Sequence, residues 1–176
     1  MHSDTIPATE PFPTGSLNAL LAGYQSYAAA RARFLAGLDL AVSCRDPLSE
    51  FSERLTAVLL GAQIAPSRVQ KGYDLIKPDG RRVQVKYLSN PEGRWVNEHH
   101  IHLTDLADEY ALVIFVALRL QSVLIFQLET LGQVCARLQK RHPEQDTTLQ
   151  LTHRNIRAIL ADPAGFTPLG VAIHRF

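Results

Sequence analysis

Hydrophobic and polar positions change period several times along the chain, and these changes predict alternating helices and strands. A helical period with abundant alanine runs over residues 16–38 and indicates a first helix. A second helix is bracketed by Pro47, which suits a first turn, and Gly61, which suits an exit. Its second half, LTAVLLG, is apolar almost all round, which is typical of a helix buried on several sides.

Downstream of this second helix, period-two segments and short apolar runs predict a β-rich region. Residues 72–77 and 81–88 flank the turn signal Pro78-Asp79-Gly80, so residues 72–88 are predicted to form a β-hairpin. The other predicted elements are a weak strand at 62–65, a strand at 99–103, a short helical turn at 104–109, paired strands at 111–118 and 122–128, and helices at 129–141 and 152–161.

This order of elements indicates a mixed α/β (α+β) fold. With 176 residues, the chain fits one compact domain with an additional arm. Residues 1–15 contain three prolines and little periodic apolarity, so we expect a flexible tail there. Residues 16–45 are expected to form an N-terminal helical arm, and residues 46–176 the folded domain.

Composition narrows the class of protein only slightly. The chain is 46% hydrophobic and 20% charged, as an ordinary globular protein is. It contains neither an apolar run of roughly 18 residues nor a signal-peptide pattern, so we expect a soluble, cytoplasmic protein that does not enter a membrane. Cys44 and Cys135 lie far apart and form no disulfide or zinc pattern, which fits a reducing compartment.

Charge is distributed unevenly around the predicted hairpin. The net charge of +1 gives no overall argument for a nucleic-acid partner. Residues 66–102, however, hold seven Lys or Arg against four Asp or Glu, together with three histidines. This modest local excess is sufficient for a few phosphate contacts but not for strong non-specific binding.

The strand at 81–88 carries the candidate chemistry. Because side chains alternate between faces, Arg82, Gln84 and Lys86 are predicted to share one face, opposite to Val83, Val85 and Tyr87. Asp74 lies on the partner strand of the hairpin. A carboxylate, an amide oxygen and an ammonium group close together suit metal-dependent phosphodiester hydrolysis, because Mg²⁺ prefers hard oxygen ligands.

Each of these groups has a candidate role. Asp74 would be the charged metal ligand, and the Gln84 side chain and the Val85 carbonyl would be neutral ligands. Lys86 would stabilise the transition state or help to deprotonate the attacking water. Glu53, an acid on the largely apolar second helix, is a fourth candidate, since such an acid requires a partner when buried. Glu50 is its substitute one turn away, and a plain surface acid is an equal alternative for Glu53.

A Glu-bearing helix followed by Gly-Tyr-Asp, a tight turn and Gln-x-Lys resembles the PD-(D/E)XK nuclease superfamily. The segments SERLTAVLLGA and KGYDLIKPDGRRVQVK are most similar to small bacterial restriction-endonuclease-like proteins with Mrr-like motifs. The resemblance covers residues 47–130. It implies a restriction-endonuclease-like mixed sheet flanked by helices (αβββαβ), a Mg²⁺ or Mn²⁺ cofactor, Asp74 as the first acid, Lys86 as the lysine and Glu53 as the helix acid.

Gln84 departs from the pattern of this superfamily, because it stands where Asp or Glu is usual. Some members with Mrr-like motifs carry Gln at this position, but the change removes one negative charge from the metal site. The leading hypothesis is a metal-dependent DNA endonuclease, a hydrolase that pairs two sites in a homodimer. The alternatives are a catalytically weak or inactive DNA-binding or interaction module, and an RNA-directed nuclease. Nothing in the sequence identifies a partner methyltransferase.

Further residues are candidates for contact with DNA: Lys71, Arg81, Arg82, Arg94, Trp95, His100 and His102. The basic residues equally fit a solvated loop, and a loop tryptophan more often folds back onto its own domain than wedges into a groove. His100 and His102 share a strand face, as zinc ligands can. No third ligand has a suitable spacing, so DNA contact or simple exposure is the preferred interpretation.

Overall fold

The computed structural model describes residues 17–40, 46–66, 72–90, 99–140 and 147–176. The chain divides into two compact units, Met1–Pro47 and Leu48–Phe176. In the first unit, helix α1 spans Leu17–Gly37. Helix α2, Pro47–Leu60, opens the second unit. Gly61 follows α2 with a φ of 59°, a left-handed conformation that glycine adopts without strain and that ends the helix.

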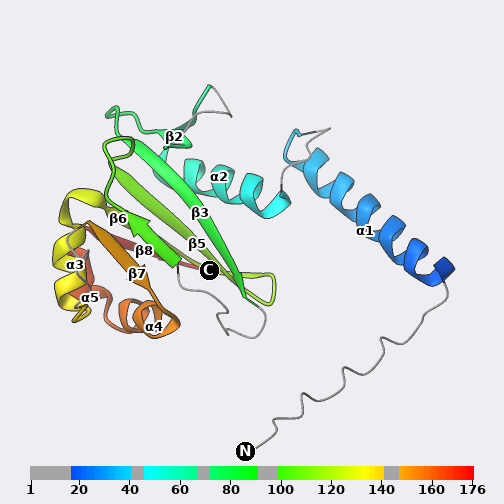
Figure 1. Ribbon diagram of the computed structural model, residues 1–176. Coiled ribbons are helices and arrows are strands. Elements are labelled where there is room, and N and C mark those ends of the chain that lie inside the picture. The colour runs from blue at the N-terminus through cyan, green and yellow to red at the C-terminus, as the bar shows by residue number, and fades with distance from the viewer. Residues whose placement is uncertain (1–16, 41–45, 67–71, 91–98, 141–146) are drawn as a thin grey trace, which may run out of the picture. The chain divides into compact units, whose positions relative to one another are not determined.

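A mixed sheet of six strands forms the centre of the second unit (Figure 1), with the order β1-β2-β3-β5-β6-β8 among the described residues. Only β3 and β5 are parallel; the other neighbouring pairs are antiparallel. The strands are β1 (Gln63–Ile64), β2 (Leu75–Ile76), β3 (Arg82–Asn90), β5 (Glu109–Val116), β6 (Arg119–Gln127) and β8 (Val171–Arg175).

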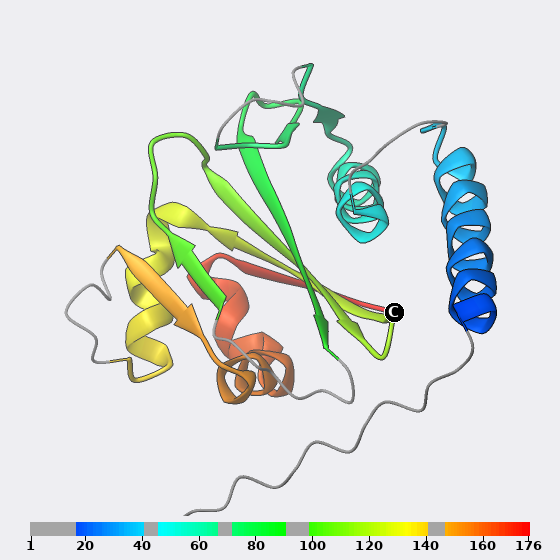
Figure 2. The same cartoon turned by 45° about the vertical axis from the view of Figure 1, so that its right-hand side comes forward.

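Helices cover both faces of this sheet (Figure 2). Helix α2 packs on one face, where its apolar side chains meet Val83, Val85 and Val113. The opposite face meets the remaining elements, and Leu112, Leu124 and Phe126 lie in their common core. Those elements are β4 (His99–His102), α3 (Leu131–Arg137), β7 (Thr148–Leu151), α4 (His153–Ala161), α5 (Pro163–Phe166) and the 3₁₀ turns Leu128–Thr130 and Thr167–Leu169.

The central strand β5 is buried on both faces, which explains its continuous apolar sequence. The predicted pairing of this strand with β6 is confirmed, as is the turn at Pro78-Asp79-Gly80, where Gly80 has a φ of 85°. The mixed α/β class is therefore confirmed. None of the helices in the described ranges combines the length and apolar character that crossing a bilayer requires.

Several predicted boundaries were wrong. The strand expected at 72–77 is reduced to Leu75–Ile76, and residues 104–109 form a turn that leads into β5 instead of a helix. Helix α3 ends at Arg137, and Gln139 just beyond it has a φ of 55°, which a continuing helix cannot accommodate. The strand at 99–102 pairs with β7 in a separate ribbon of two strands. The sequence reasoning missed β7, α5 and β8.

Candidate functional site

The candidate site is built where β2 and β3 separate. The Asp74 amide donates to the Val83 carbonyl at 2.8 Å, although the register of β2 and β3 pairs Val83 with Leu75. Two residues further along β3, a side chain replaces the backbone of the neighbouring strand as acceptor: Asp74 Oδ2 accepts the Val85 amide hydrogen at 2.7 Å. The strand is therefore short for a physical reason: the carboxylate of Asp74 satisfies the backbone donor that a longer β2 would have satisfied.

The same geometry brings a backbone oxygen to this edge. In an antiparallel pair, the amide and carbonyl of one residue point to the same neighbouring strand. Since the Val85 amide points to Asp74, the Val85 carbonyl is directed at the same edge of β3. Asp74 is partly exposed, so the edge is open to solvent.

Gln84 and Lys86 lie on the face of β3 opposite to the one that packs on α2. Val83 and Val85 are buried in the α2-side core, so the residues between and beyond them point away from it. Gln84 is partly exposed and Lys86 is exposed, and their register neighbours on β5 are Tyr110 and Leu112. The predicted sharing of one face by these two side chains is thus borne out by the register.

Two groups that sequence reasoning did not include among the site residues, His99 and Tyr110, lie beside this face. The His99 Nε2 and the Tyr110 hydroxyl are hydrogen-bonded at 2.7 Å. Burial lowers the pKa of His99 to about 4, and the nearby positive charges of His100, Lys86 and His102 act in the same direction. Burial also raises the pKa of Tyr110, and the negative charge of Asp74 adds to that rise.

Charges of the predicted site therefore influence this pair: Lys86 adds to the lowering of the His99 pKa, and Asp74 adds to the raising of the Tyr110 pKa. Two weak sequence signals were available: HHIH alternates in a way that separates His99 from His100, and Tyr110 is a polar-tipped side chain at the start of an apolar strand. Neither signal alone distinguishes such a pair from ordinary core packing.

The donor set at this edge fits a hard cation. The Asp74 carboxylate keeps a second oxygen beyond the one that accepts from Val85, and the Val85 carbonyl is a neutral oxygen at the same edge. The Gln84 amide, on the adjoining face of β3, would be the second neutral oxygen. Mg²⁺ commonly uses one or two carboxylates and completes its shell with water and substrate phosphate. Across the described residues, no cluster of three or more His, Cys, Asp or Glu side chains is arranged to hold a metal ion. A site here would therefore rest on this mixed set of oxygens.

Glu53 and Glu50 are placed elsewhere in the fold. Both are buried on α2. This helix covers the Val83 and Val85 face, whereas Gln84 and Lys86 lie on the other face. The assistance of Glu53, or of Glu50 in its place, stays a prediction.

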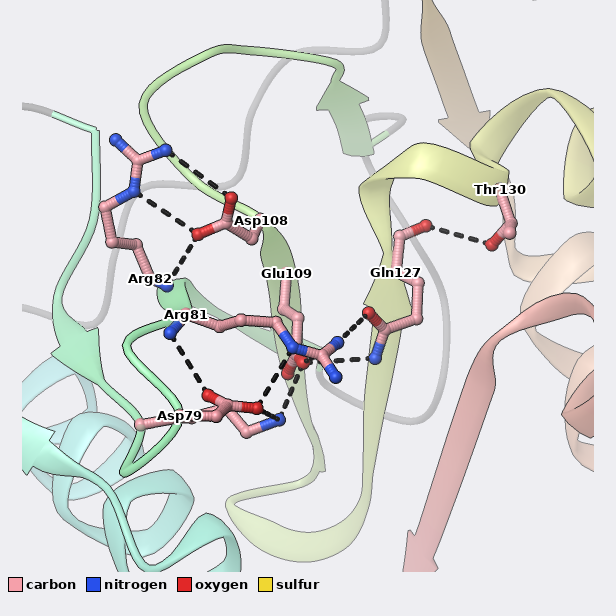
Figure 3. Close-up of polar contacts among 8 residues, drawn as sticks. Asp79, Arg81, Arg82, Asp108, Glu109, Gln127 and Thr130 are labelled. Carbon is pink, nitrogen blue, oxygen red and sulfur yellow. Dashed lines mark hydrogen bonds and ion pairs between the residues drawn. The ribbon is translucent and has the colours of Figure 1, made fainter.

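A polar network lies at the start of β3, next to the candidate site (Figure 3). Glu109 on β5 is 1% exposed, and its Oε1 accepts from Lys77 Nζ at 2.8 Å, Arg81 Nη1 at 3.0 Å and Gln127 Nε2 at 3.1 Å. Arg81 also pairs with Asp79 in the hairpin turn. The network therefore connects the hairpin to β5 and β6.

Arg82, the first residue of β3, is held in a similar way by Asp108, which directly precedes β5. Its backbone amide donates to Asp108 Oδ2 at 2.8 Å, and its guanidinium pairs with the same carboxylate at 3.3 Å. The bond from the backbone amide is the main reason that the pKa of Asp108 lies below its ordinary value. Arg81 and Arg82, both predicted to contact DNA, thus have defined intramolecular partners, and contact with DNA remains a prediction for both.

The other residues predicted to contact DNA are His100, His102, Lys71, Arg94 and Trp95. His100 and His102 are exposed on β4 with their rings 5.9 Å apart, and His102 Nδ1 lies 3.1 Å from the Thr148 hydroxyl. Lys71, Arg94 and Trp95 lie outside the described residues.

A scan against protein-family models and a search of the curated proteins found no match to this chain.

Proposed function

We propose that this protein is a metal-dependent DNA endonuclease with a restriction-endonuclease-like core. One observation carries the proposal: the Asp74 carboxylate binds the Val85 amide on the strand that presents Gln84 and Lys86. This hydrogen bond supports a site in which the Asp74 carboxylate and the Val85 carbonyl would be joined by the Gln84 amide oxygen and the exposed Lys86. Of the αβββαβ order implied by the sequence resemblance, α2, the β2–β3 hairpin and the parallel pair of β3 and β5 are present, but the residues described between β3 and β5 form β4 and a turn in place of the expected helix.

The chemistry assigned to each residue follows from its charge and exposure. Asp74, the Val85 carbonyl and Gln84 would hold Mg²⁺ or Mn²⁺. When bound, such an ion supplies Lewis-acid polarisation of a phosphate and a more acidic water. Lys86 is an exposed cation on the same face as Gln84, so it can stabilise the charge that develops on the phosphate or hold the attacking water.

The test uses the purified full chain with supercoiled plasmid, single-stranded DNA and RNA, each with Mg²⁺, Mn²⁺ or EDTA. The informative variants are Asp74→Asn and Lys86→Ala. Asp74→Asn keeps an oxygen that can accept from Val85, so it removes the charge of the site with little effect on the backbone geometry. Lys140→Ala is the matched control, because this lysine follows α3 and is not part of the site.

We expect metal-dependent cleavage of DNA that falls by about 100-fold or more in both site variants, as for other residues that stabilise developing charge, and is unchanged in Lys140→Ala. DNA binding without cleavage, unaffected by Lys86→Ala, would instead identify an inactive DNA-binding module. That alternative is motivated by the neutral Gln84 at a position where a carboxylate would strengthen metal binding. Cleavage confined to RNA would identify the third candidate, an RNA-directed nuclease.

A further inference from the structure

The amide of Gln84 poses a problem of orientation that a carboxylate does not. Both oxygens of a carboxylate can bind a cation, whereas only one end of an amide can; the other end carries two hydrogen-bond donors. A metal site built with Gln84 therefore needs a neighbour that holds the NH₂ group and turns the oxygen towards Asp74. Among the described residues, no side-chain hydrogen bond already occupies the Gln84 amide.

Tyr110 stands in the position from which this can be done. It is the register partner of Gln84 in the parallel β3–β5 pair, and partners in a pair project their side chains to the same face of a sheet. The tyrosine is thus a direct neighbour of Gln84 across the parallel pair.

His99 determines what the Tyr110 hydroxyl can offer. Its Nε2 lies 2.7 Å from the Tyr110 oxygen, and its ring is packed 5.8 Å from the tyrosine ring between centroids. A neutral imidazole that carries its proton on Nδ1 accepts a hydrogen bond from the phenol O–H at Nε2. The tyrosine oxygen then presents only its lone pairs to the face of the sheet, and it can accept a hydrogen bond from an amide NH₂ group.

We propose that Tyr110, with its hydroxyl held by His99, is a positioning residue that turns the oxygen of the Gln84 amide towards Asp74. This inference rests on the proposed metal site and adds two residues to it. It requires no proton transfer. It also gives a reason for a neutral amide to function at this position, because the hydrogen bond restores by orientation part of what the missing charge removes.

The distinguishing experiment is a double-mutant cycle on metal binding. Mn²⁺ affinity is measured by titration calorimetry for the full chain and for Tyr110→Phe, Gln84→Glu and the double variant. Tyr110→Phe removes one hydroxyl without altering the ring. Tyr87→Phe is the matched control, because it removes a hydroxyl from the opposite face of β3.

We expect Tyr110→Phe to weaken Mn²⁺ binding about fivefold, as the loss of one hydrogen bond implies. In the Gln84→Glu background the same change should have less than about a twofold effect, because a carboxylate needs no orientation. His99→Leu should match Tyr110→Phe, and the two changes together should be no worse than either alone.

The outcomes separate this inference from the proposed function. If Mn²⁺ binds and Asp74→Asn abolishes the binding, but Tyr110→Phe acts equally with Gln84 and with Glu at position 84, the positioning role is wrong and the metal site stands. If the full chain binds Mn²⁺ no better than Asp74→Asn, both are wrong. Circular dichroism of each variant verifies folding, and should His99→Leu fail to fold, the tyrosine cycle decides the question alone.

Discussion

At the scale of single residues, side-chain carboxylates accept hydrogen bonds from backbone amides that strand pairing leaves without an acceptor. Asp74 accepts the amide hydrogen that a longer β2 would have taken. Asp108 does the same for the Arg82 amide at the neighbouring edge. Each carboxylate is thereby fixed by a charge-assisted hydrogen bond, which is stronger than a bond between neutral groups. A residue fixed in this way is suited to present its remaining oxygen to a ligand.

Glu109 should be important for stability. Its carboxylate is buried and satisfies Lys77, Arg81 and Gln127 at once. We expect Glu109→Gln to lower the free energy of unfolding in urea by about 2 kcal/mol, because hydrogen bonds to charged groups contribute ~1.5–3 kcal/mol. Arg81 is half-exposed, so solvent screens part of the loss. The control is Glu129→Gln at an exposed position, and equal midpoints for the two variants would contradict this assignment.

At the scale of elements, the β2–β3 hairpin determines where the candidate site can form. Its turn holds Gly80 at a φ of 85°, and the segment before β2 holds Gly72 at a φ of 101°. A Cβ at Gly80 would meet nothing within 4 Å, whereas a Cβ at Gly72 would lie 2.4 Å from Leu106 Cβ. The two glycines therefore meet the same backbone requirement in very different surroundings.

Replacing these glycines should separate stability from function. Gly80→Ala should cost about 1–2 kcal/mol, the penalty of a left-handed conformation for an L-residue, and leave Mn²⁺ binding unchanged. Gly72→Ala should cost more and also weaken Mn²⁺ binding, because relief of the clash with Leu106 moves the segment that carries Asp74. Urea denaturation and calorimetry measure the two quantities, and unaltered Mn²⁺ binding in Gly72→Ala would rule out this coupling.

The sequence supported the hairpin and the alternation along β3, because period two and a Pro-Asp-Gly turn are local properties. It could not place His99, since the partner of β4 is β7, a short segment almost 50 residues away whose TLQL pattern carries little signal. Tyr110 was missed for a related reason. A tyrosine at the start of an apolar strand suits a core, and only the parallel register puts it beside Gln84.

At the scale of the whole molecule, two cores pack on opposite faces of the sheet that carries the candidate residues. The α2-side core fixes Val83 and Val85, and the other core fixes Tyr110 and Leu112. Gln84 and Lys86 are consequently positioned by a strand whose neighbours are packed from both sides. Placing a site on rigid elements in this way favours a precise arrangement of its ligands.

Double-strand cleavage by such a site would require a second copy of the chain, since one site cuts one strand and a twofold pair presents the same surface twice. We expect helix α1 to provide the contact surface, since Leu21, Tyr24 and Tyr27 are exposed at 49%, 67% and 59%. We expect the chain to sediment as a dimer and the variant Tyr24→Glu/Tyr27→Glu to sediment as a monomer. Cleavage of a plasmid by this double variant should yield nicked circles in place of linear product, with Mn²⁺ binding unchanged. Val58→Glu, at an exposed apolar position of α2, is the control, and linear product from a proven monomer would contradict the role of α1.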